Sequence, residues 1–222
     1  MIKKVIKEPN GETSVFLYIP NIFTNDKIDT ISNWLKNKHY REGITHWNNS
    51  SIREQLWFQE DNKYFCEHWT KRYPRWESNK YDPELFQLQE DIQNILDKID
   101  LDYNVIQKPK LNSILCNKYR NKDDSIKPHR DTALTFGTTP TIVGLSIGAT
   151  RRLQVKRLIY DKDNPNTFIY DNEYTEHNFD IPLENGSLFI MAGCSQKYFS
   201  HEIPKEEHEC GERFSLTFRE VI

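Results

Sequence analysis

Two segments in the first hundred residues space their apolar side chains as an amphipathic helix does. In residues 23–37 the apolar face consists of Ile28, Ile31, Trp34 and Leu35, and Thr24 or Asn25 offers a side-chain cap. In residues 81–99 Asp82 offers the cap and Pro83 takes the first helical position. The stripe of this second helix consists of Leu85, Leu88, Ile92, Ile95, Leu96 and Ile99. The sequence therefore predicts two helices, each with one face against a core.

From about residue 111 the pattern changes to short apolar or alternating runs separated by turn-rich segments. These runs predict strands at residues 111–119, 141–148, 151–159, 186–193 and 213–221. Helices first and many short strands later indicate an α+β domain whose core is an antiparallel sandwich or barrel. A double-stranded β-helix, or jelly roll, fits this number of strands, although the count alone does not select it.

An aromatic segment without a sustained helical or strand period lies between the two predicted helices, at residues 46–81. It holds four of the five tryptophans, together with Arg53, Lys71, Arg72 and Arg75. One interpretation is an irregular segment that packs on the core and covers it. The other is a recognition lid, in which flat rings stack on bases and cations meet phosphates.

Length and composition indicate one globular domain. The chain has 222 residues, of which 36% are hydrophobic and 28% charged, and no apolar run approaches the ~20 residues that span a bilayer. The basic start lacks the apolar core of a signal peptide, and the four cysteines show no CxxC spacing. We therefore expect an intracellular protein without a membrane segment. The net charge of −3 gives no overall attraction to nucleic acid, so such binding requires a local basic surface.

His129 and Asp131, in the stretch IKPHRDTA, are the first candidates for chemistry. On an extended chain, residues two apart point to the same face, so both side chains can reach one ion. A third ligand has to come from a distant strand, and His201 follows the apolar run 186–193. Two histidines and a carboxylate form the facial triad of non-haem Fe(II) oxygenases. Taken alone the pattern is common, and two ordinary polar residues in a loop would explain it as well.

The last predicted strand, RFSLTFREV, separates its apolar and polar residues. Alternation puts Phe214, Leu216 and Phe218 on one face and Arg213, Ser215, Thr217 and Arg219 on the other. The Cα atoms of the two arginines are about 20 Å apart, and side chains leaning inward bring their heads to roughly 6 Å. Such a pair can hold both ends of a short dicarboxylate, although exposed arginines often only cover a surface. Upstream, Asn117 and Tyr119 share a strand face and offer an amide and a phenol as neutral donors.

Taken together, NKY, HRD, the later histidine and RFSLTFR closely resemble the ordered motifs of the AlkB family of Fe(II)/2-oxoglutarate dioxygenases. That family carries N-x-Y, HxD, a distal His and R-x-N-x-T-x-R in the same order. The resemblance covers about residues 111–221. It includes DSIKPHRD and GSLFIM, which are closest to the eukaryotic duplex-DNA repair branch. Four ordered motifs are specific, and they favour the metal interpretation of HRD.

The resemblance implies the cofactors Fe(II) and 2-oxoglutarate, with O2 as the second substrate. Fe(II) would be ligated by His129, Asp131 and His201. Arg213, helped by Tyr119, would pair with the distal carboxylate of 2-oxoglutarate. Arg219 and Asn117 would lie near its metal-chelating end.

The resemblance also implies a jelly-roll core with a nucleotide-recognition lid contributed by the N-terminal half. The whole chain, 1–222, would be a single domain, with helices and lid in about 1–105 and the catalytic core in about 106–222. Arg53 and Gln55 resemble the P-R-x-Q element of the family, with Ile52 in place of the proline. Tyr73 and Trp76 are candidates for contact with a base or the backbone.

Two departures from the family pattern concern the site. Ser215 replaces the usual Asn, so one polar contact near the cosubstrate is shorter or mediated by water. Relatives that repair N1- or N3-methylated bases carry an acidic residue two places after the metal Asp, and here Ala133 follows Thr132 instead. An acid there would favour a cationic base. Its absence is compatible with a neutral lesion, another modified base, or recognition by a different residue.

The function that the resemblance implies is oxidative demethylation of N-alkylated bases in DNA or RNA, by a monomer in the nucleus or cytoplasm. The base would be flipped out of a duplex or taken from a single strand. An alternative is an oxygenase of the same fold that acts on protein or lipid, for which an aromatic and basic lid would have little use. A non-catalytic nucleic-acid-binding module would be expected to lack a ligand, whereas all three candidates are present.

Overall fold

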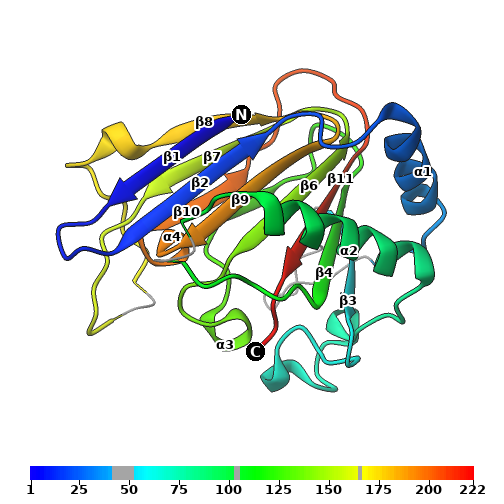
Figure 1. Cartoon of the computed structure of the whole chain (residues 1–222), viewed down its shortest axis with the longest axis horizontal. Coiled ribbons are helices and arrows are strands. Elements are labelled where there is room, and N and C mark those ends of the chain that lie inside the picture. The colour runs from blue at the N-terminus through cyan, green and yellow to red at the C-terminus, as the bar shows by residue number, and fades with distance from the viewer. Residues whose placement is uncertain (42–52, 103–105, 165–166) are drawn as a thin grey trace.

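Two antiparallel sheets, packed face to face, form the framework of the chain (Figure 1). The computed structural model describes residues 1–41, 53–102, 106–164 and 167–222. The major sheet has seven strands, in the order β1 (Ile2–Lys7), β2 (Thr13–Ile19), β9 (Ser187–Gly193), β6 (Ile142–Gly148), β11 (Arg213–Arg219), β4 (Ser113–Tyr119) and β3 (Glu54–Gln59). The minor sheet has four, in the order β5 (Ile126–His129), β10 (Phe199–Ile203), β7 (Arg151–Arg157) and β8 (Phe179–Leu183). This arrangement confirms the predicted α+β class with a jelly-roll core.

The two predicted helices cover the outer face of the major sheet (Figure 1). They are α1 (Asn25–Lys36) and α2 (Pro83–Lys98), and their buried apolar residues join those of the sheet in one cluster. Both caps are the predicted ones, because the side chain of Thr24 accepts from the N–H of Lys27 and that of Asp82 from the N–H of Leu85. The shorter helices are α3 (Ala133–Phe136), α4 (Ser195–Tyr198) and the 3₁₀ turns η1 (Glu67–Trp69), η2 (Pro74–Trp76) and η3 (Thr175–His177).

The face of the major sheet that looks toward the minor sheet carries the site. On β11, Phe214, Leu216 and Phe218 are at most 1% exposed and belong to the cluster under the helices. The alternate residues of the strand therefore point between the sheets, as predicted. A second apolar cluster fills much of this space, with Phe16 and Phe189 from the major sheet and Val155 and Phe199 from the minor sheet.

All five predicted strands are present, but the expectation of only helices and lid in residues 1–105 was incomplete. That part of the chain also supplies β1, β2 and β3 to the major sheet. The apolar run of β2 is buried on both faces, by the helices and by the minor sheet, so it lacks the alternation that marks a half-exposed strand. Strands β5 and β10 are only four and five residues long, too short for a clear period.

The aromatic segment packs on the core, and part of it also lines a cavity. Trp57, on β3, is fully buried and packs edge-to-face on Phe65 with ring centroids 4.9 Å apart. Phe65, Trp69 and Trp76 then line a cavity between the sheets. Residues 46–52, which include Ile52 of the predicted lid element, lie outside the described residues.

Candidate active site

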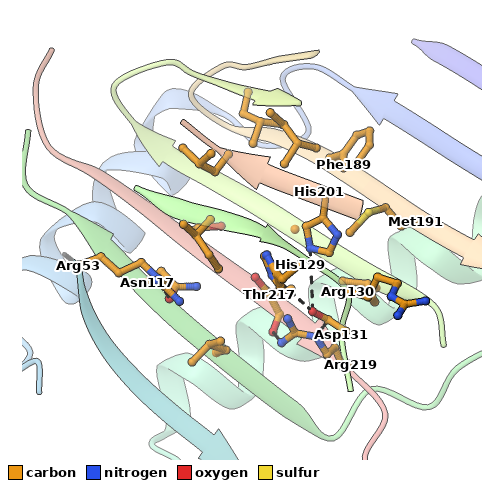
Figure 2. Close-up of a pocket in the computed structure, with 18 of the residues that line it drawn as sticks. Arg53, Asn117, His129, Arg130, Asp131, Phe189, Met191, His201, Thr217 and Arg219 are labelled. Atoms are coloured by element: carbon orange, nitrogen blue, oxygen red, sulfur yellow. Dashed lines mark hydrogen bonds and ion pairs between the residues drawn. The ribbon is translucent and has the colours of Figure 1, made fainter. Parts of the chain in front are cut away.

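Strands β5 and β10 bring the two candidate histidines together. The strands pair antiparallel with His129 opposite His201, and the ring centroids are 4.2 Å apart. Asp131 follows the end of β5, and its Oδ1 lies 3.8 Å from Nε2 of His129 and 4.0 Å from Nε2 of His201. One ligand atom from each of the three residues thus lies within 4.8 Å of the others (Figure 2). Such spacing suits a single ion bound by all three.

The surroundings fix which atom of each ligand faces the centre. Nδ1 of His129 lies 2.9 Å from the carbonyl oxygen of Lys127, so it carries the proton and Nε2 keeps its lone pair. Nε of Arg219 donates to Oδ2 of Asp131, which leaves Oδ1 turned toward the histidines. The backbone N–H of Asp131 donates to Oε1 of Gln196 at 2.9 Å. These outer contacts are of the kind that orient metal ligands.

The protonation states also suit metal binding. Burial, and next the neighbouring His129, lower the pKa of His201 to about 3, so its imidazole stays neutral. Burial by itself raises the pKa of Asp131, but the charge and the hydrogen bond of Arg219 outweigh it and lower the pKa. Two neutral imidazoles and one carboxylate are the donor set that Fe(II) oxygenases use.

Gln196 is a positioning residue that sequence patterns did not indicate. It lies on α4, directly before the strand that carries His201, and its contact ties this segment to Asp131. We expect Gln196→Ala to weaken Fe(II) binding by about 10- to 100-fold, because the backbone N–H of Asp131 loses the acceptor that helps to fix the position of this ligand. A titration with Fe(II) measures the affinity. The control variant is Gln154→Ala, because Gln154 lies on β7 and is bonded to Asp180 on β8. Equal affinity in both variants would show that Gln196 does not position the ligand.

Arg213 is buried at another part of the same cavity, with donors that have no acceptor among the described residues. It is 1% exposed, and its Nη2 donates to Oγ of Ser146 at 2.9 Å. Its Nε and Nη1 are buried without a hydrogen-bond partner among the described residues. The guanidinium carbon lies 5.1 Å from the centre of the Tyr119 ring, and burial lowers the Arg213 pKa to about 10. Because unmet buried donors are rare and costly, this site fits an anionic ligand such as a carboxylate.

The two arginines of β11 have different partners. Arg219 is bonded to Asp131, and Nη2 of Arg213 donates to Ser146. Alternation fixes the face on which a side chain lies, but it does not choose the partner at that face. The prediction that Arg219 lies near the metal-chelating end of a cosubstrate stays a prediction.

Asn117 and the two lid residues of the P-R-x-Q resemblance form one hydrogen-bonded group. Oδ1 of Asn117 accepts from Nε of Arg53 at 2.9 Å and from Nε2 of Gln55 at 3.0 Å. Arg53 and Asn117 line the cavity, whereas Gln55 supports them from a buried position. Figure 2 shows Arg53 beside Asn117 at one side of the pocket.

The cavity has a volume of about 260 Å³ and connects the residues described so far. Trp76 and Ser215 line it, as do the unpredicted Phe65, Trp69, Arg130 and Thr132. Tyr73 is not part of the wall, since it packs edge-to-face on Trp69, and the exposed Ala133 is not part of it either. The sequence of the aromatic segment has no helical or strand period, so it could not show that Trp69 lines the cavity and Tyr73 does not. Thr132 could have been predicted to line the cavity, because it directly follows the candidate ligand Asp131.

Comparisons with known proteins identify the superfamily of the chain. The sequence profile of the 2OG-Fe(II) oxygenase superfamily matches residues 15–219. The chain is 42% identical over 110 residues to alpha-ketoglutarate-dependent dioxygenase alkB homolog 3 of Bos taurus, which is 50% of this chain and 36% of that protein. It is 30% identical over 139 residues to DNA oxidative demethylase ALKBH2 of Arabidopsis thaliana, or 59% of this chain and 43% of the relative. The chain thus spans less than half the length of these relatives.

The fold has solved counterparts as well. The structure of OsALKBH1 matches with a TM-score of 0.58 at 14% identity, covering 92% of this chain and 97% of the other. A prolyl hydroxylase from Trichoplax adhaerens matches with a TM-score of 0.56 at 11% identity, covering 93% and 83%. At these identities the likeness concerns the fold alone.

The class of protein follows from the profile match, which covers most of the chain. The chain belongs to the 2OG-Fe(II) oxygenase superfamily, and within it the chain is similar to AlkB homologues. Membership implies Fe(II), 2-oxoglutarate and O2 as cofactors and cosubstrates, and the donor set at His129, Asp131 and His201 fits the metal. Among the described helices, none is both long and apolar enough to cross a membrane.

Proposed function

We propose that the chain is an Fe(II)/2-oxoglutarate-dependent oxidative demethylase of N-alkylated bases in DNA or RNA. One observation carries the proposal. A buried arginine with two unmet donors lies in the same cavity as a convergent His–Asp–His group and an aromatic wall. The relatives named alkB homolog 3 and DNA oxidative demethylase support the choice of substrate.

The cofactors would be held by residues from both sheets. His129, Asp131 and His201 would ligate Fe(II) through the atoms that face one another. Nε and Nη1 of Arg213 would donate to the distal carboxylate of 2-oxoglutarate, with the Tyr119 ring packed against the guanidinium. Asn117, Ser215 and Thr217 line the cavity between these two ends.

The protein's own residues would orient the reactants and exclude water. When bound, Fe(II) and 2-oxoglutarate supply the oxidation, in which O2, 2-oxoglutarate and the methyl group give succinate, CO2, formaldehyde and the demethylated base. Arg219 holds the outer oxygen of Asp131, so the inner oxygen keeps one orientation. Phe65, Trp69 and Trp76 would stack on the base that enters the cavity, which offsets the free energy of unstacking it.

The remaining parts of the proposal concern the setting of the reaction. The partner would be DNA or RNA with alkylated bases, and we propose that the chain acts as a monomer. The buried cysteines Cys66, Cys116 and Cys194 are free thiols, which suits the reducing nucleus or cytoplasm where such a substrate is found.

A mass assay tests the proposal. The protein is incubated with Fe(II), 2-oxoglutarate and oligonucleotides that each carry one N-methylated base, in DNA and RNA form. We expect at least one methylated oligonucleotide to lose one methylene in mass and to stimulate 2-oxoglutarate turnover above the level with its unmethylated counterpart. If no oligonucleotide changes mass and turnover is not stimulated, demethylation of nucleic acid is not the function.

A further inference from the structure

A single helical turn, α4, lies directly beside the candidate metal site. Oε1 of Gln196 accepts from the backbone N–H of Asp131 at 2.9 Å. The carbonyl oxygen of the next residue, Lys197, accepts from Nη1 of Arg130 at 3.5 Å. Two successive residues of the HRD motif are thus bonded to two successive residues of α4. A displacement of this turn would therefore act on the ligand Asp131.

The turn is too short to hold its position by itself. It has only four residues, and isolated helices shorter than about 12 residues are marginal in water. Cys194, the residue before it, makes no side-chain hydrogen bond that would cap it. The position of α4 therefore depends on its contacts with neighbouring segments.

The turn between β1 and β2 supplies such a contact through the carboxylate of Glu12. Nζ of Lys197 lies 2.8 Å from Oε1 and 2.6 Å from Oε2 of Glu12, and the hydroxyl of Tyr198 donates to Oε2. These hydrogen bonds, first that of Lys197 and then that of Tyr198, lower the pKa of Glu12 to about 2. The carboxylate therefore stays ionised near neutral pH and binds both residues that follow Gln196.

Glu12 is itself fixed by its surroundings. Its backbone N–H donates to Oδ1 of Asn10 at 3.1 Å, and Nδ2 of Asn10 donates to Oε2 of Glu12 at 2.9 Å. The same Nδ2 lies 3.1 Å from the hydroxyl of Tyr198. One residue further along the chain, the carbonyl oxygen of Thr13 accepts from the N–H of Cys194 at 2.8 Å. The segment that joins β1 to β2 is thus bonded to both ends of α4.

We propose that Glu12 is a positioning residue for the metal ligand Asp131 and acts through Gln196. The inference rests on the proposed function, of which it needs only the metal site. By fixing the end of α4, the Glu12 carboxylate keeps Gln196 where it accepts from the N–H of Asp131. Without that contact, Asp131 would keep its bond to Arg219 but lose a second bond that orients it.

The first test is the variant Glu12→Gln. The side chain keeps its size, but one acceptor oxygen is replaced by an amide nitrogen that can only donate. We expect Fe(II) to bind about 3- to 10-fold more weakly in an anaerobic titration of the full chain, because α4 is then less firmly held.

Asp91→Asn is the matched control. The Asp91 carboxylate also pairs with a lysine, Lys27 at 2.9 Å, and its side chain is 27% exposed, compared with 34% for Glu12. This ion pair joins α1 to α2 on the outer face of the major sheet. We expect Asp91→Asn to bind Fe(II) as the wild type does.

A second background tests whether Glu12 acts through Gln196. In Gln196→Ala the side-chain contact with Asp131 is already absent, so adding Glu12→Gln is expected to change the Fe(II) affinity by less than about twofold. Two independent effects would instead multiply. Denaturant titration of the metal-free proteins measures any general loss of stability separately.

The absorption spectrum of Co(II), bound in place of Fe(II), reports the geometry of the ligands without any turnover. We expect the visible bands to change in Glu12→Gln in the same direction as in Gln196→Ala, because both variants release the same ligand, Asp131. The spectrum of Asp91→Asn is expected to match that of the wild type.

The outcomes separate this inference from the proposed function. An Fe(II) affinity of Glu12→Gln equal to that of the wild type overturns the inference and leaves the metal site intact. Equal losses of affinity in the wild-type and Gln196→Ala backgrounds also overturn it, because Glu12 would then not act through Gln196. A Co(II) spectrum that changes in Gln196→Ala but not in Glu12→Gln overturns it as well. If the wild type binds no Fe(II), the proposed function itself fails.

Discussion

Replacing Arg213 with methionine is expected to raise the KM for 2-oxoglutarate by at least about a hundredfold and to make the ligand-free protein more stable. The first effect follows because the cosubstrate loses a buried charge-assisted partner. The second follows because Nε and Nη1 of Arg213 are buried without acceptors in the part of the chain that the structure describes, whereas methionine has no donor to leave unmet. We expect the free energy of unfolding to rise by about 1–3 kcal/mol. Steady-state kinetics and denaturant titration measure the two effects.

Arg151→Met is the matched control, because Arg151 is equally buried but fully bonded. Its guanidinium donates to Glu206 and to the carbonyl oxygens of Asn121, Asp124 and Pro204. Removing it breaks the ion pair with Glu206 and takes a donor from three carbonyl oxygens, so we expect a loss of about 3–5 kcal/mol in the free energy of unfolding. If both variants lose stability alike, Arg213 is an ordinary structural arginine and not a ligand site.

His129→Ala is expected to lower the rate of demethylation by at least about a thousandfold, because Fe(II) loses one of its three protein ligands. The His129 side chain is 31% exposed, so the free energy of unfolding of the metal-free protein is expected to change by less than about 1 kcal/mol. Turnover and Fe(II) binding are measured together with those of His208→Ala, a histidine in an exposed loop that we expect to behave as the wild type. An active His129→Ala variant would contradict the metal assignment.

Much of the site could be predicted because strand alternation sorts residues by face. On β11 the phenylalanines pack under the helices and the arginines point between the sheets, as the sequence indicated. The proximity of His129 and His201 did not follow from spacing alone, since the residues are far apart in the chain and meet only through the pairing of β5 with β10. Only the ordered motifs of the family indicated that the two histidines belong to one site.

The partners of these residues could not be predicted, because a partner depends on rotamers and on distant segments. Arg219 and Arg213 share a face of β11, yet one is bonded to Asp131 and the other keeps unmet donors. Gln196 lies in a short polar run that has no distinguishing pattern, although its Oε1 accepts the Asp131 N–H. In the aromatic segment, an irregular backbone decides that Trp69 lines the cavity and Tyr73 does not.

The stoichiometry of a single turnover assay tests the central claim most directly. With Fe(II), limiting 2-oxoglutarate and an oligonucleotide carrying one N-methylated base, we expect one formaldehyde and one succinate for each methyl group lost. Chelation of the metal should stop all three changes together. Formaldehyde-free consumption of 2-oxoglutarate, or loss of the methyl group without succinate, would contradict the proposal that this cavity couples cosubstrate oxidation to demethylation.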